Sequence, residues 1–339
     1  MLKQNQMHSS YINETPPLDG GICDLVDWIE FKALSNEFLT YKLSDLRSLH
    51  EELEDTVDDD ISFQDNLDES KLDEVFSEIS LRESSLDDAY PFKLDNNTYE
   101  LIASKPEETT LGGWIYMYCL IVSHAKPDTV LKTSIGLTNS DKRRDHLQVA
   151  ATYAAGAVLG NAVSFGFPRP EQTEILQAIK TVFTEHIKEG RCLDQPKDGC
   201  LTHSKDAGID VIAWMSFFDN LPGRLIMYGQ VASGYNWKEK SIINDVKKFY
   251  DTFFSDEPGS HWVPSMFIPF CLDKEGAEQL SNRVNFLTKE FGIIFGRYRL
   301  PRLAQIGHEK RHLSNHYIER IDESDCFKEF VNTFKQPQD

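Results

Sequence analysis

The sequence predicts an α/β protein in which a mixed β-sheet flanked by helices follows an acidic, mainly helical N-terminal region. Three observations support this prediction. Helix-like and strand-like patterns alternate after residue 140, two apolar runs near the middle of the chain have a hairpin signature, and a block of acidic residues precedes both. The length of 339 residues fits two domains, and a hydrophobic content of 40% is sufficient for packed cores.

We predict a disordered lead over residues 1–20, an acidic N-terminal region over 21–139 and an α/β domain over 140–330. The lead is polar and rich in Pro and Gly towards its end. Within the N-terminal region the hydrophobic spacing predicts the following elements: one or two helices within 23–50, a loop over Asp55–Ser70, a helix over Leu72–Ile79, strands within Phe92–Ala103 and a buried helix over Leu111–His124.

The net charge of −20 is concentrated in one part of the chain. Residues 44–88 contain 17 Asp and Glu against 3 Lys and Arg, whereas from Ala89 onward 32 acids face 29 bases. A block this acidic is typical of a solvated face. The alternative is an interaction surface that shields a nucleic-acid site or binds a basic partner.

The α/β domain alternates helical and strand patterns along its length. A helix is predicted from a cap at Ser140 or Asp141 through Val158. The other predicted elements around the hairpin are a strand over Ala162–Phe167, a helix over Glu171–Glu189, a loop over Arg191–Lys205, a helix over Lys238–Phe254, a strand over Val263–Phe270, a helix over Lys274–Phe291 and a strand over Gly292–Leu300.

The hairpin consists of two apolar runs, Ile209–Trp214 and Leu225–Gln230, on either side of a turn containing Pro222 and Gly223. The first run carries Asp210 in an otherwise hydrophobic stretch. A buried carboxylate costs several kcal/mol unless it is paired, hydrogen-bonded or bound to a metal. Asp210 is therefore either a metal ligand or a structural carboxylate bonded to the backbone.

This arrangement resembles the PD-(D/E)xK nuclease superfamily, which has the restriction-endonuclease-like fold. In that family an Asp is followed, one hairpin later, by Glu or Gln, one residue and Lys. Asp210 and Gln230 match the first two positions, and Ala232 replaces the lysine. The G-Q-x-A-x-G-x-N-W variant looks like nuclease-like proteins encoded beside bacterial anti-phage systems. The resemblance covers roughly residues 142–300 and implies an αβββαβ core, here with a helix inserted before the hairpin.

The resemblance implies a divalent metal, Mg²⁺ or Mn²⁺, at Asp210 and Gln230, since Mg²⁺ prefers oxygen ligands. In this superfamily a further acid often comes from the first helix, and Asp145 lies about where it belongs, with Gln148 as the neighbouring alternative. Lys238 or Lys240 is expected to reach back and replace the missing lysine. The alternative is that these two lysines are solvated.

The stretch between residues 297 and 320 is the best candidate for phosphate contact, because Arg and Lys supply sequence-independent affinity for nucleic acid. The alternative is a solvated basic helix. The candidate residues are Arg297, Arg299, Arg302, Lys310 and Arg311.

We therefore predict a metal-dependent DNA endonuclease that acts as an anti-phage effector, with a partner protein such as an ATPase or helicase; RNA is an open alternative to DNA. The competing hypothesis is a catalytically inactive member of the superfamily that binds nucleic acid or scaffolds a complex. Scattered cysteines, the lack of an apolar N-terminal segment and the lack of a long apolar stretch predict a cytoplasmic protein without membrane attachment. A homo-oligomer is compatible with the sequence.

Overall fold

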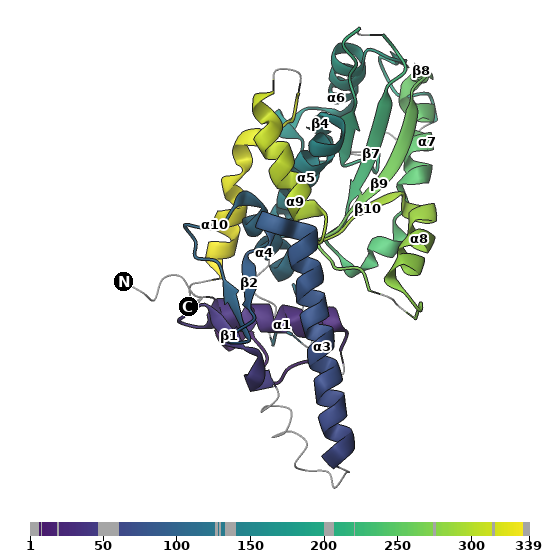
Figure 1. Cartoon of the computed structure of the whole chain (residues 1–339). Helices are drawn as coiled ribbons and strands as arrows, with labels where there is room; N and C mark the ends of the chain where they lie inside the picture. Colours follow the sequence, from purple (N-terminus) through teal and green to yellow (C-terminus); the bar gives the residue numbers. More distant parts are fainter. Residues whose placement is uncertain are drawn as a thin grey trace. The chain divides into compact units, whose positions relative to one another are not determined.

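The protein is a mixed α/β structure, as the sequence predicts (Figure 1). The computed structural model describes residues 7, 9–18, 20–46, 61–125, 128, 130–132, 140–199, 207–219, 221–273, 276–313 and 316–334. Residues 47–60 of the acidic block lie outside these ranges. So do residues 1–6, 8 and 19 of the predicted lead and residues 200–205 of the predicted loop. Among the residues that the structure does describe, none of the helices combines the length and the apolar character needed to cross a bilayer.

The chain forms two compact units, which are described separately. Unit 1 comprises residues 1–138 and 326–339, and unit 2 comprises residues 139–325. The last helix, α10 (Asp325–Thr333), therefore belongs with unit 1 from residue 326 onward, although the sequence assigns residues up to 330 to the α/β domain. The reason is aromatic packing, since Phe327 and Phe330 contact the ring of Tyr118 edge-on.

Unit 1 combines helices with a small antiparallel sheet of strand order β1-β3-β2. Its longer elements are α1 (Ile22–Ser35), β1 (Thr40–Lys42), α3 (Ile61–Leu86), β2 (Phe92–Asp95), β3 (Glu100–Ala103) and α4 (Leu111–Ser123), with short turns η1 (Ser9–Tyr11) and η2 (Asp87–Ala89). The buried helix expected over 111–124 is confirmed, and Thr110 caps it by accepting the N–H of Gly113 at 3.1 Å.

Two predictions for unit 1 are wrong. Residues 9–18 of the predicted disordered lead belong to the packed structure, because Ile12 is 1% exposed and pairs with Leu131. Residues 61–70 are the first turns of α3 and not part of a loop. The polar stretch between Ile61 and Ser70 shows too little apolar periodicity to indicate a helix by itself. The helix is anchored further along, where Val75 and Ile79 are fully buried.

Unit 2 is built on a five-stranded sheet of order β10-β9-β7-β6-β4. Strands β4, β6 and β7 pair antiparallel, whereas β7, β9 and β10 pair parallel. Its main elements follow the order α5 (Ser140–Leu159), β4 (Asn161–Ser164), α6 (Ile175–Lys180), β6 (Val211–Trp214), β7 (Leu225–Val231), α7 (Ile242–Phe253), β9 (His261–Phe267), α8 (Leu280–Phe291), β10 (Ile293–Phe295) and α9 (Leu300–Glu309).

Short elements complete unit 2. They are η3 (Pro170–Gln172), the π-helical turn η4 (Thr181–Ile187), β5 (Arg191–Cys192), η5 (Tyr235–Glu239), β8 (Phe254–Asp256), η6 (Lys310–His312) and η7 (Ile321–Glu323). The helix predicted over 171–189 begins only at Ile175, because Thr173 and Glu174 have extended backbone with ψ of 135° and 152°. The helices predicted from Lys238 and Lys274 begin later, at Ile242 and Leu280.

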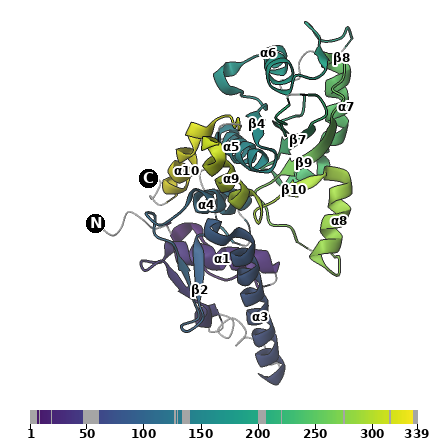
Figure 2. The same cartoon turned by 45° about the horizontal axis from the view of Figure 1, so that its top comes forward.

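Helices cover both faces of the five-stranded sheet (Figures 1 and 2). The α7 and α8 helices lie on one face, and α5 lies on the other. The α9 helix packs against α5 so closely that a Cβ at Gly307 would lie 2.0 Å from the carbonyl oxygen of Tyr153. The apolar residues on the α7 and α8 face are buried in two clusters, so the sheet is the rigid centre of unit 2.

Candidate functional site

Asp210 lies immediately before β6 and is only 4% exposed. Its N–H donates to the carbonyl of Gly229 in β7 at 2.9 Å, and its own carbonyl accepts the N–H groups of Phe165 and Gly166 at 2.8 and 2.9 Å. In a regular strand the N–H and C=O of one residue point to the same neighbouring strand. Here they point to opposite neighbours, and such irregularities commonly re-aim a side chain next to an active site.

The Asp210 carboxylate is fixed on two sides. Its Oδ2 atom accepts the backbone N–H of Val231 at 2.8 Å. A Cβ atom built on Gly166 would lie 2.5 Å from both Oδ1 of Asp210 and Oε1 of Gln148, so these two oxygens are separated by no more than twice that distance. Gln148 is held in this position because its Nε2 group donates to Ser164 Oγ at 2.6 Å and to the Gly166 carbonyl at 3.1 Å. The absence of a side chain at position 166 therefore leaves room for two converging oxygen atoms.

Gln230 lies next to Asp210 in the hairpin, since Asp210 bonds to both of its chain neighbours, Gly229 and Val231. The Oε1 atom of Gln230 is buried and has no hydrogen-bond partner among the residues that the structure describes. Leaving a buried acceptor without a donor costs about 1–3 kcal/mol, so such an atom requires an explanation. A ligand that accepts electron density from the amide oxygen, such as a cation, provides one.

The two glutamine side chains lie on opposite faces of the sheet. Gln230 pairs in register with Met266, which belongs to the apolar cluster that contains Leu287 and Phe291 of α8. Gln148 belongs to α5, on the other face. The space at Gly166 brings the Asp210 carboxylate and the Gln148 amide together on the α5 side, whereas Gln230 adjoins Asp210 through the backbone of β7.

The positions expected to supply a lysine have different surroundings. Ala232, which replaces the family lysine, is 1% exposed and packs in the α8 cluster, where an ammonium group would be costly to bury. The Lys238 ammonium lies 5.7 Å from the centre of the Trp237 ring. Burial lowers the pKa of Lys238, the nearby Arg283 lowers it further, and Asp273 raises it. Lys240 is half-buried at the end of η5.

Asp145 is engaged elsewhere. It forms a two-pronged ion pair with Arg320, at 2.6 Å from Nη1 and 2.8 Å from Nη2. Arg320 also pairs with Glu323. On α5 it is therefore Gln148, three residues further along the helix, that lies beside Asp210.

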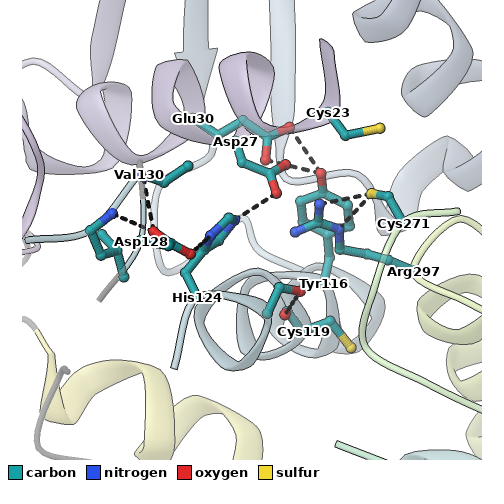
Figure 3. A network of polar contacts seen from close by, with 12 residues as sticks. Cys23, Asp27, Glu30, Tyr116, Cys119, His124, Asp128, Val130, Cys271 and Arg297 are labelled. Atoms are coloured by element: carbon teal, nitrogen blue, oxygen red, sulfur yellow. Dashed lines mark hydrogen bonds and ion pairs between the residues drawn. The ribbon is translucent and has the colours of Figure 1, made fainter. Parts of the chain in front are cut away.

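The candidate phosphate-binding residues divide into buried and exposed positions. Arg297 is only 1% exposed, and its Nε and Nη2 groups donate to Cys271 Sγ at 3.1 and 2.7 Å (Figure 3), so this guanidinium cannot reach a phosphate at the surface. Arg299 and Arg311 are exposed, and each donates to a neighbour on the chain. The remaining two are half-buried, namely Arg302 and Lys310.

Unit 1 contains a second set of buried charges, which is not among the predicted site residues (Figure 3). Arg82 is fully buried and donates to Asp27 at 2.7 Å, to Glu30 at 2.9 Å and to Glu78 at 2.8 Å. Tyr116 donates to both oxygens of Glu30 at 2.9 Å. Asp27 and Glu30 interrupt an apolar run of α1 in the same way that Asp210 interrupts its strand, which is the signal that the sequence offered.

His124 extends this network by bonding to Asp27 at 2.9 Å and to Asp128 at 2.6 Å. Burial alone would lower the pKa of His124, but the two carboxylates raise it to about 9. The atoms of Asp24, Asp27 and His124 lie within 4.8 Å of one another, close enough for a metal. However, both ring nitrogens of His124 already bond to carboxylates, and Asp27 already pairs with Arg82. The atoms that could bind a metal are thus already engaged in ion pairs, so we interpret this network as structural.

No family model, no curated protein and no solved structure matches this chain. The geometry of the two units is therefore the basis for the functional argument.

Proposed function

We propose that unit 2 is a PD-(D/E)xK-like nuclease domain that hydrolyses phosphodiester bonds of DNA with Mg²⁺ or Mn²⁺ at Asp210. The element order α5, β4, β6, β7, α7, β9 is consistent with the αβββαβ core, with α6 and η4 inserted before the hairpin. The proposal keeps the expected role as an anti-phage effector whose partner, such as an ATPase or helicase, selects the target.

The buried and unpartnered Oε1 atom of Gln230, beside Asp210, is the observation that carries the proposal. With the Asp210 carboxylate it offers oxygen donors of the kind that Mg²⁺ prefers, and Gln148 Oε1 with Asp210 offers the alternative set on the other face of the sheet. The fit is limited in charge, because the two amides are neutral and Asp210 is the one carboxylate of the set. We therefore expect weak metal binding that is completed by substrate phosphate and water.

Each side chain has a separate task in this proposal. Asp210 supplies the negative charge, and the N–H of Val231 fixes its orientation. Gln148 or Gln230 adds a neutral oxygen from its own face of the sheet. When bound, the metal would activate a water molecule and stabilise the charge that develops on the phosphate. Lys238, whose pKa is lowered by burial, is the proposed proton donor or water-orienting group.

A specific observation favours a second candidate, the inactive nucleic-acid-binding or scaffolding subunit. The position of the family lysine is closed by the apolar contacts of Ala232 in the α8 cluster. If neither Lys238 nor Lys240 replaces that group, the fold can bind a metal and nucleic acid without efficient hydrolysis.

Nicking of supercoiled plasmid in Mg²⁺ or Mn²⁺ tests the proposal. We expect wild-type protein to nick, and Asp210→Asn to reduce the rate at least 100-fold, because the carboxylate that holds the metal is lost. Asp251→Asn, which removes an exposed acid on α7 of the same unit, is the control and should nick normally. Absence of metal-dependent nicking by folded wild-type protein, with metal binding retained, would select the inactive candidate.

A further inference from the structure

We infer that a pocket beside β4 binds an unstacked nucleobase that carries an exocyclic amino group, next to the Asp210 site. The pocket has a volume of about 500 Å³ and lies entirely within unit 2. It is lined by β4, the turn η3, the α6–η4 segment and residues 317–319. The inference takes its nucleic-acid ligand from the proposed function and adds a recognition site to it.

The pocket is adjacent to Asp210 through a single strand. Phe165, which lines the pocket, donates its N–H to the Asp210 carbonyl at 2.8 Å. Neighbouring strands are separated by about 4.8 Å. A nucleotide whose base occupies the pocket would therefore place its phosphate near the end of β6, where Asp210 is located.

One wall of the pocket is an aromatic column. The ring of His186 stacks on Tyr317 with centroids 4.6 Å apart and 24° between planes, and its other neighbour is Trp214 at 5.6 Å. Burial lowers the pKa of His186, so this ring is neutral at physiological pH. The Tyr317 side of the column is 42% exposed, which leaves an aromatic surface on which a base can stack.

Glu319 supplies the polar recognition group. Its Oε2 atom accepts the N–H of Ser164 at 2.7 Å, which holds the carboxylate against the edge of β4. Within the described part of the chain, Oε1 of Glu319 makes no hydrogen bond. Burial raises the pKa of Glu319 above its ordinary value, the Ser164 N–H and Arg320 oppose this increase, and the carboxylates of Glu323 and Glu171 add to it. A ligand N–H aimed at Oε1 would relieve the effects of burial and of these carboxylates.

The charges of the pocket distinguish a base from a phosphate. Two carboxylates, Glu171 and Glu319, face one guanidinium, that of Arg169. The Arg169 guanidinium donates to the carbonyls of Thr173 at 2.8 Å and Phe165 at 3.0 Å. Phosphate would be repelled, whereas the amino group of cytosine, adenine or guanine can donate to a carboxylate. Uracil and thymine offer carbonyl oxygens on either side of their single N–H, which a carboxylate disfavours.

The test is the binding of single-stranded hexamers of deoxycytidine and deoxyuridine to the full-length protein in EDTA, which removes catalysis from the measurement. These oligomers differ only at the amino or carbonyl edge of the base. We expect wild-type protein to prefer deoxycytidine by about tenfold, corresponding to one discriminating hydrogen bond. Glu319→Gln keeps an oxygen for Ser164 but presents an amide N–H to the base, so the preference should disappear or reverse.

Tyr317→Leu should weaken binding of both hexamers about tenfold, because it removes the stacking surface, and Tyr317→Phe should restore it. The matched controls are Glu290→Gln, an exposed acid on α8, and Tyr99→Leu, an exposed tyrosine of unit 1. Equal wild-type affinity for the two hexamers, or unchanged binding in both pocket variants, overturns the inference even if plasmid nicking occurs. Conversely, an intact base preference without nicking refutes the nuclease and leaves the pocket standing.

Discussion

Two regions of this protein bury carboxylates in apolar surroundings, and they compensate the charge in different ways. In unit 1, Asp27 and Glu30 face the guanidinium of Arg82, and Asp27 also faces the His124 ring. In unit 2, Oδ2 of Asp210 accepts a backbone N–H, and its Oδ1 lies close to a glutamine oxygen at the space left by Gly166. We infer that a buried carboxylate with converging oxygen acceptors indicates a binding site. A buried carboxylate that is paired with cations indicates a structural network.

The largest expected effect is on the stability of unit 1. Replacing Arg82 by Met leaves Asp27, Glu30 and Glu78 buried without their cation, which should lower the free energy of unfolding by about 3–5 kcal/mol. Lys93→Met, an exposed cation on β2, should have little effect. Urea unfolding of both variants, monitored by hydrogen exchange of the amides in α1 and α4, measures the change in the free energy of unfolding. Equal stability of Arg82→Met and wild type would show that this network is not structural.

The ion pairs of His124 with Asp27 and Asp128 make the stability of unit 1 depend on pH. The folded-state pKa of about 9 lies above the ordinary value of 6.5, so protonated His124 stabilises the fold. That contribution is fully present below about pH 6.5 and is lost as the pH rises through about 9, with a total of about 3 kcal/mol. Urea unfolding at several pH values should show this slope, His124→Gln should remove it, and His261→Gln, an exposed control, should keep it.

Gly166→Ala probes the Asp210 region directly. The new Cβ would lie 2.5 Å from Asp210 Oδ1 and Gln148 Oε1, which should cost about 1–3 kcal/mol and weaken binding of Mn²⁺. Gly259→Ala, where nothing lies within 4 Å of the added atom, is the matched control. Titration of Mn²⁺ by electron paramagnetic resonance measures the metal effect. Unaltered affinity in Gly166→Ala would separate Gln148 from the site.

Gln230→Leu should have the smallest effect on stability, and in the unusual direction. Removing a buried acceptor that lacks a donor should stabilise the metal-free protein by about 1 kcal/mol, while metal-dependent nicking falls. Gln305→Leu, which removes a buried glutamine bonded to Glu309, should destabilise instead. Retained nicking in Gln230→Leu, with loss in Gln148→Leu, would assign the metal to the α5 face.

Local patterns were sufficient to predict the hairpin around Asp210 and the buried helix that begins at Leu111, because each is bounded by residues with a clear conformational preference. The beginning of α3 could not be predicted, since residues 61–70 are polar and the buried anchor lies one to two turns later. The later start of the helix predicted over 171–189 depends on the extended backbone of Thr173 and Glu174, which residue type alone does not specify.

The candidate site was predicted in part. Asp210 stands out in the sequence because a charged residue in an apolar strand is uncommon, and Gln230 is indicated by the family resemblance. Choosing Gln148 over Asp145 requires the knowledge that Arg320 pairs with Asp145. The burial of Arg297 and Arg82 could not be predicted either. Arginine side chains are usually solvated, and only tertiary contacts show that these two are enclosed.

The most direct test of the central claim is a crystal structure with Mn²⁺ soaked in, measured for anomalous scattering. We predict an anomalous peak within coordination distance of Asp210 and of an amide oxygen from Gln148 or Gln230. We predict no peak at Asp24, Asp27 and His124, because Asp27 and His124 are already engaged in ion pairs. A peak at that unit 1 cluster and none beside Asp210 would contradict the account.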